Sequence, residues 1–135
     1  MPGQYAVVRC QGWLVGDLHK EDHRELVRHL SAAATSKDAI VNHDLAIGFY
    51  SKRMGLPVAA KVYANHARWQ ADDRGLGERV FVVGYRNMHP DVTRRILSDL
   101  AAQMALNGYV PDGDPAVFGG DHGLLFALRF RPAGS

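Results

Sequence analysis

The residues best suited to chemistry are a glutamate, a tyrosine and a short polar run at the ends of apolar segments. Glu78 stands directly before the apolar segment 80–85, and Tyr50 closes the segment 38–50, which the polar run 42–44 interrupts. A carboxylate at a strand end can hold a cationic ligand, and neighbouring aromatic rings add cation–π attraction. The pattern indicates a small-molecule site, with an ordinary turn glutamate and an amphipathic strand-end tyrosine as the alternative.

The seven histidines do not form a metal-binding pattern. His19 and His23 stand four residues apart, with Glu21, Asp22 and His29 nearby. Zinc needs three or four ligands that converge in a tetrahedron, and two histidines at the start of one helix do not supply them. The chain also lacks a His-Glu-x-x-His pattern and has a single cysteine. We therefore predict no metal and no cofactor.

Glycine and serine patterns point to no known catalytic loop. The glycines at 75–77 and 119–120 lack the strand-to-helix setting and the lysine of phosphate-binding loops, so we interpret them as turns. None of the serines stands in a nucleophile-elbow context. A serine hydrolase is unsupported.

Composition and charge favour one packed domain over residues 1–135. The hydrophobic fraction is 47%, and 16 basic residues nearly balance 14 acidic ones. A dedicated nucleic-acid or membrane-surface protein normally concentrates basic charge on one face, so neither class of partner is expected. We see no signal peptide or membrane-spanning segment, and we expect a cytoplasmic protein.

The first half of the chain predicts a strand, a helix and a second strand. Residues 5–15 are β-branched and aromatic enough for a strand, and 20–34 shows helical periodicity. Residues 38–50 resemble a strand with a polar interruption. Residues 57–72 are rich in alanine and predict a helix, and a strand over 58–64 is the alternative.

The second half predicts a strand, a helix and a closing strand. The near-continuous apolar run of 79–86 is typical of a buried central strand. A helix follows, with Pro90 in its first turn and Gly108 at its end. Residues 109–121 have the composition of a surface loop, and 123–130 form the final strand.

This order of elements predicts an α+β fold. Right-handed crossovers over one sheet give a ferredoxin-like β-α-β-β-α-β sandwich whose two helices pack on one face of the sheet. The segment between the second and third core strands is then an additional insertion, which we expect to be helical.

Read in order, several segments resemble the bacteriophage-encoded S-adenosylmethionine lyases, long called hydrolases. Residues 24–33 are similar to that family's first helix, and 44–50 resemble its Asp-Leu-x-Gly-x-Tyr segment with one residue inserted. Glu78 matches a glutamate before the middle strand. Residues 85–87 lead into the second helix as the family's corresponding turn does, and 123–127 resemble its closing strand.

The resemblance implies a homotrimer that binds S-adenosylmethionine between subunits. The substrate's own carboxylate attacks its γ-carbon, which gives 5′-methylthioadenosine and homoserine lactone. Because a sulfonium already leaves readily, holding the substrate folded and shielded from water would supply most of the acceleration. Such an enzyme depletes the methyl donor in the host cytoplasm and counters restriction.

The resemblance also assigns roles to individual residues. Glu78 and Tyr50 would be the catalytic pair, with Glu78 orienting the cationic amino-acid end. The family has a glutamine before its last strand, which Asp121 or His122 would replace here. The expected substrate-binding residues are Asp44, Phe49, His122 and Asp121.

A function of another class fits the same residues. The chain would then be a non-catalytic ferredoxin-like module that binds a small molecule or a protein partner, with 109–121 as its contact surface. Nucleic-acid binding ranks last, since the charges and aromatic residues are not organised for it.

Overall fold

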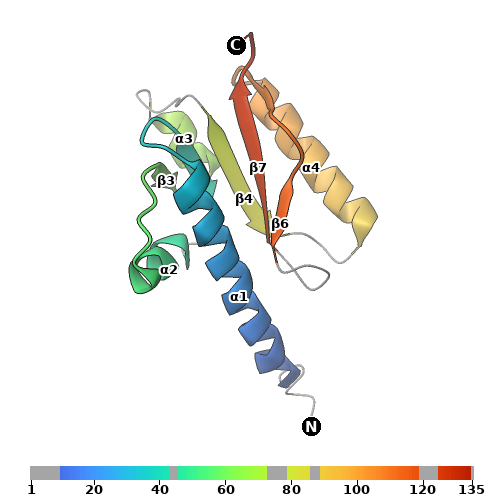
Figure 1. Cartoon of the computed structure of the whole chain (residues 1–135). Coiled ribbons are helices and arrows are strands. Elements are labelled where there is room, and N and C mark those ends of the chain that lie inside the picture. The colour runs from blue at the N-terminus through green and yellow to red at the C-terminus, as the bar shows by residue number, and fades with distance from the viewer. Residues whose placement is uncertain (1–9, 43–45, 73–78, 86–88, 119–124, 135) are drawn as a thin grey trace.

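The protein folds into an open mixed β-sheet with helices on both faces (Figure 1). The computed structural model describes residues 10–42, 46–72, 79–85, 89–118 and 125–134. Four helices and six strands lie within these ranges, which confirms the predicted α+β class. In chain order they are α1 (Cys10–Ala33), β2 (Ala39–Asn42), α2 (Ala46–Met54), β3 (Lys61–Tyr63), α3 (His66–Ala71), β4 (Val80–Tyr85), α4 (Pro90–Ala105), β5 (Tyr109–Pro111), β6 (Ala116–Phe118) and β7 (Leu125–Pro132).

The sheet has a parallel half and an antiparallel half. Its strand order is β3-β2-β4-β7-β5, and β6 also pairs with β7. β2 runs parallel to β3 and to β4, whereas β7 runs antiparallel to β4, β5 and β6. The ferredoxin-like arrangement is not confirmed, because three neighbouring strands run parallel and helices cover both faces.

Each face of the sheet carries its own apolar core. On one face α1 and α2 pack over Ile40, Phe81 and Val83. On the other face α3 and α4 pack over Val41 and Val82. Alternate residues of β2 and β4 thus enter opposite cores, which explains why the strand at 79–86 reads as continuously apolar. None of the described helices is both long and apolar enough to cross a membrane.

A buried ion pair joins the end of α1 to the beginnings of β2 and β4. The side chain of Asp38 is fully buried and accepts hydrogen bonds from Arg79 Nη2 at 2.9 Å and from the Thr35 backbone N–H at 2.8 Å. Arg79 Nη2 also donates to the Ala33 carbonyl oxygen at 2.9 Å. The Ala39 N–H donates to the Arg79 carbonyl oxygen at 3.0 Å. This cluster holds the two central parallel strands in register.

Four predicted elements are confirmed as regular structure at nearly the expected places. The helix predicted at 20–34 coincides with the second half of α1, which ends at Ala33, and the strand predicted at 79–86 contains β4. The helix that Pro90 opens is α4, and the closing strand is β7. Long unbroken periodic patterns give the strongest local signal, which is why these elements could be recognised.

The predicted strand at 5–15 is wrong over 10–15, the part of it that the structure describes. Residues 10–15 are helical and belong to α1, while 5–9 lie outside the described residues. Tryptophan, valine and cysteine are only a few tenths of a kcal/mol poorer than alanine in a helix. Continuing a formed helix adds one hydrogen bond per residue and outweighs that preference.

The predicted strand at 38–50 is correct only at its beginning. β2 ends at Asn42 and α2 begins at Ala46, so Phe49 and Tyr50 are helical residues. Ile47, Tyr50 and Met54 all pack on the same core. Their spacing of three and four residues is that of one helix face, and this was the overlooked signal.

Two other regions contain more structure than the sequence predicted. The helix predicted at 57–72 divides into β3 and α3, so the alternative strand at 58–64 holds in part. Asn65 begins α3 by accepting the Arg68 backbone N–H at 2.9 Å. The predicted loop at 109–121 contains β5 and β6, whose three residues each are held by pairing along β7.

We expect Asp38→Asn to lower the free energy of unfolding by about 2–4 kcal/mol, because it leaves Arg79 without its carboxylate partner. Burial alone would raise the pKa of Asp38, but hydrogen bonds from Arg79 and Thr35 and the charge of Arg79 together hold it below 3.8. The stabilisation is therefore present above the unfolded pKa and lost as the pH falls through the folded value.

Urea denaturation between pH 7 and pH 2 measures this contribution. The exposed Asp114→Asn variant serves as the control and should change the unfolding free energy little. Equal stability of Asp38→Asn and the wild type at neutral pH would contradict the proposed role of the ion pair.

Candidate functional site

In the parallel half of the sheet, successive connections of the chain lie on opposite faces, and the direction in which strands are added reverses between β2 and β4. From β2 the chain passes through α2 to β3 on one side, then through α3 to β4 on the other side. α2 packs on one face and α3 on the other. In open sheets of this kind, ligands bind outside the carboxyl ends of the strands where the connections diverge. The edge formed by the carboxyl ends of β2 and β4 is therefore the first place to seek a site.

β6 ends and β7 begins at the same edge. Tyr85, at the carboxyl end of β4, and Phe118, at the end of β6, both pair with Leu125. Asn42 ends β2 and is buried. Three predicted substrate-binding residues follow these strand ends in the sequence and lie outside the described residues: Asp44, Asp121 and His122.

The predicted catalytic glutamate, Glu78, also lies outside the described residues. Its neighbour Arg79 is described and lies at the amino end of β4, beside Ala39. With a rise of about 3.3 Å per residue, Val80 and Tyr85 are about 17 Å apart along the strand. Arg79 is thus at the edge opposite the carboxyl ends of β2 and β4. Convergence of Glu78 with Tyr50 stays a prediction.

Tyr50 and Phe49 are described, and both line a hollow beside α1 and α2. Arg24 of α1 and Arg53 of α2 complete this hollow of about 220 Å³, which we call the aromatic–basic hollow. The Tyr50 ring stacks on the buried ring of His23, with centroids 5.4 Å apart and an interplanar angle of 23°. Two of the predicted site residues are therefore neighbours in space.

The rings of the aromatic–basic hollow differ in exposure. Tyr50 packs against the core cluster from its partly buried position, so its orientation is fixed by α1. Phe49 stands edge-on to Tyr50 at 5.0 Å and is 57% exposed. The Arg53 guanidinium lies 5.9 Å from the Phe49 ring centroid. The arrangement offers an accessible flat ring beside positive charge.

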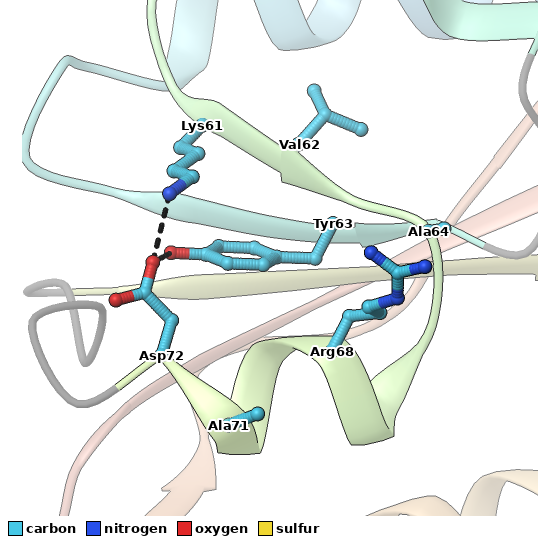
Figure 2. Close-up of a pocket in the computed structure, with 7 residues that line it drawn as sticks. All are labelled: Lys61, Val62, Tyr63, Ala64, Arg68, Ala71 and Asp72. Atoms are coloured by element: carbon cyan, nitrogen blue, oxygen red, sulfur yellow. Dashed lines mark hydrogen bonds and ion pairs between the residues drawn. The ribbon is translucent and has the colours of Figure 1, made fainter.

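A second hollow, of about 590 Å³, lies between β3 and α3 (Figure 2). Lys61 Nζ and the Tyr63 hydroxyl both approach Asp72 Oδ2, each at 2.8 Å. Figure 2 shows Val62 pointing away from this carboxylate and Arg68 projecting from α3 at the other end of the hollow. The prediction of one helix over 57–72 hid this arrangement, because β3 has only three residues and is held by pairing with β2.

The hydrogen bonds in this second hollow connect α3 with β3. Burial raises the pKa of Tyr63, and the hydrogen bond to Asp72 raises it further. The phenol therefore stays protonated and donates to Asp72, which ends α3 and whose backbone N–H bonds the Trp69 carbonyl oxygen. Asp72 fastens α3 to the edge strand β3.

Metal binding is the next chemistry to consider in the described part of the chain. Within it, no three histidine, cysteine, aspartate or glutamate side chains gather as metal ligands. Comparison with known proteins yields no match to a family model, a curated protein or a solved structure. Support for a function therefore comes from the contacts, charges and burial of this chain's own residues.

We expect Asp72→Asn to lower the pKa of Tyr63, because the negative charge that disfavours the phenolate is removed, while burial continues to raise the pKa. Absorbance titration of the tyrosines measures the shift, and Tyr63→Phe identifies which transition belongs to Tyr63. Tyr109, whose pKa is raised by burial alone, should not respond. A pKa of Tyr63 that is unchanged in Asp72→Asn would contradict the hydrogen bond between Tyr63 and Asp72.

Proposed function

We propose that this chain is a binding module for a small molecule that carries a flat ring and an oxyanion. The proposed site is the aromatic–basic hollow. The observation that carries the proposal is the exposed Phe49 ring, which Tyr50 supports from one side and Arg53 flanks with positive charge. Aromatic faces bind ring systems by stacking, and guanidinium groups recognise carboxylates and phosphates.

One wall of the hollow is fixed before a ligand arrives. Tyr50 is held by stacking on His23 and by the core beneath it, so binding does not have to order that ring. Its volume of about 220 Å³ is below the roughly 300–1,000 Å³ of sites that enclose drug-sized ligands. It suits a ring and one anionic group, with the rest of the ligand extending toward solvent.

We expect adenosine monophosphate to bind more tightly than adenosine, because only the monophosphate offers an oxyanion to Arg53. Loss of one charge-assisted hydrogen bond costs about 1.5–3 kcal/mol, so Arg53→Gln should weaken the monophosphate roughly tenfold to a hundredfold. Phe49→Ala should weaken both ligands by removing the ring. Isothermal titration calorimetry measures each affinity.

Matched control variants separate this site from general charge and surface effects. Arg95→Gln removes an exposed arginine from α4, and Val117→Ala shortens an exposed apolar side chain on β6. Neither should change the affinity. Equal affinities for the monophosphate and the nucleoside, or an unaffected Phe49→Ala variant, would contradict the proposal.

Degradation of S-adenosylmethionine is the second candidate function. One observation favours it: both described residues that the resemblance assigns, Tyr50 and Phe49, line one hollow. S-Adenosylmethionine has the required adenine ring and a carboxylate. Its sulfonium would be repelled by Arg24 and Arg53, so Glu78 or Asp44 would have to hold the cation. In a trimer with sites between subunits, Glu78 would come from a neighbouring subunit.

The chemistry of this reaction makes binding the better-supported function. The substrate carboxylate forms a C–O bond at the γ-carbon while the C–S bond breaks and its electron pair passes to sulfur. No proton and no cofactor are consumed. A carboxylate held by a guanidinium is a weaker nucleophile, so the arginines of the hollow oppose this step. The ferredoxin-like arrangement and the trimer belong to this second proposal and stay predictions.

Incubation with S-adenosylmethionine, followed by chromatography for 5′-methylthioadenosine, tests the second candidate. A lyase that uses the predicted pair should lose most of its turnover in Glu78→Gln and a smaller share in Tyr50→Phe, while Arg95→Gln keeps full turnover. Absence of methylthioadenosine from a protein that binds adenosine monophosphate would remove the lyase and retain the module. Turnover that Glu78→Gln leaves unchanged would remove the assignment of that glutamate.

A further inference from the structure

A small pocket between α1, the sheet and the β5–β6 connection lies apart from the aromatic–basic hollow and shares no residue with it. Its volume is about 140 Å³, and its lining includes His29 of α1, Phe81 of β4 and Arg129 of β7. At roughly 30 Å³ per water in the liquid, it has room for about four or five water molecules. The pocket is therefore the size of a small ion or of one functional group.

Arg129 is held in place at one end of its guanidinium group. Its Nε lies 3.2 Å from the carbonyl oxygen of Asp112 and 3.1 Å from Oδ2 of the same residue. Its terminal nitrogens make no hydrogen bond to any residue in the described part of the chain. The neighbouring Gly113 has φ +92°, and a Cβ there would come 3.6 Å from Arg129 Nη2. The terminal nitrogens thus keep their capacity to donate.

His29 is a partly buried imidazole among aromatic rings. Its ring centroid lies 5.4 Å from that of Phe118 and 6.4 Å from that of Phe81. Neither ring nitrogen has a hydrogen-bond partner among the residues that the structure describes. Burial lowers the pKa of His29 below 6.5, and the nearby charge of Arg129 lowers it further. The neutral ring therefore offers one N–H donor and one acceptor nitrogen.

We propose that His29 and Arg129 form a binding site for a small oxyanion, either a phosphate group or a carboxylate. The guanidinium would donate from its terminal nitrogens to one or two ligand oxygens, and the imidazole N–H would donate to another. The Asp112 carboxylate is already paired with Arg129. Asp114 is exposed where it lines the pocket, so its charge is screened by solvent.

Occupancy should change the protonation of His29 in a measurable direction. The charged groups that line the pocket with the ring are Arg129 from β7 and Asp112 and Asp114 from the β5–β6 connection. On α1, Glu25 precedes His29 by four residues, about one helical turn. A bound anion offsets the charge of Arg129, so it favours the imidazolium form. The anion should therefore raise the pKa of His29.

The test uses the whole chain and follows the His29 ring protons by NMR during pH titrations. Three titrations are compared at matched ionic strength: one with inorganic phosphate, one with acetate and one with sodium chloride. We expect phosphate or acetate to raise the pKa of His29 relative to chloride, and we expect Arg129→Gln to abolish that rise. In Arg129→Gln the dissociation constant, read from chemical shifts, should increase at least about tenfold. His29→Asn identifies the resonance.

The control is Arg131→Gln, which removes the same charge from the same strand two residues further along. It should keep the anion-dependent rise of the His29 pKa. A response to chloride equal to the responses to phosphate and acetate, or an equal loss in Arg131→Gln, would overturn the site. If Arg129→Gln fails to fold, the wild-type comparison of phosphate, acetate and chloride still decides the question. A response to phosphate alone or to acetate alone identifies which oxyanion the site selects.

Discussion

The buried ion pair of Asp38 and Arg79 stabilises the register of the two central strands, β2 and β4. It connects the carbonyl group that ends α1 with the beginnings of two parallel strands, and it stands beside the pairing of Ala39 with Val80. A shift of one residue between strands would turn every side chain to the opposite face. Because a displaced Asp38 would leave Arg79 without its carboxylate, the pair opposes such a shift. The ion pair therefore contributes to the correct register of β2 and β4 as well as to the stability of the fold.

Both apolar cores follow from this register. With Ile40 beside Phe81, one face receives α1 and α2, and with Val41 beside Val82 the other receives α3 and α4. β4 then fixes β7, which approaches so closely that a Cβ on Gly84 would lie 2.9 Å from the Phe126 ring. Only glycine fits there without a shift of that ring.

The sequence predicts elements whose signal is local and misses those held by distant contacts. β4 and α4 have long patterns with clear ends, and both were predicted. β5 and β6 have three residues each and exist through pairing with β7, so no local pattern reveals them. α2 was hidden because the apolar residues of 38–50 were read as one strand, although Ile47 and Tyr50 follow a helical period. Tyr50 was singled out from sequence as a strand-end residue, but the structure presents it from a helix.

The difference between local sequence signals and distant contacts also applies to the two proposed binding sites. Phe49 and Tyr50 are adjacent in sequence, so their clustering could be anticipated, whereas His29 and Arg129 are brought together only by the packing of α1 on β7. The aromatic–basic hollow and the pocket of His29 and Arg129 both carry arginine in a chain whose formal net charge is only +2. Anion selection would then arise from desolvated groups within a few ångströms of the ligand, because salt screens the weak overall charge over about 10 Å. Near-neutral composition gives the chain little overall charge, but it places no limit on a local anion site built from one fixed guanidinium.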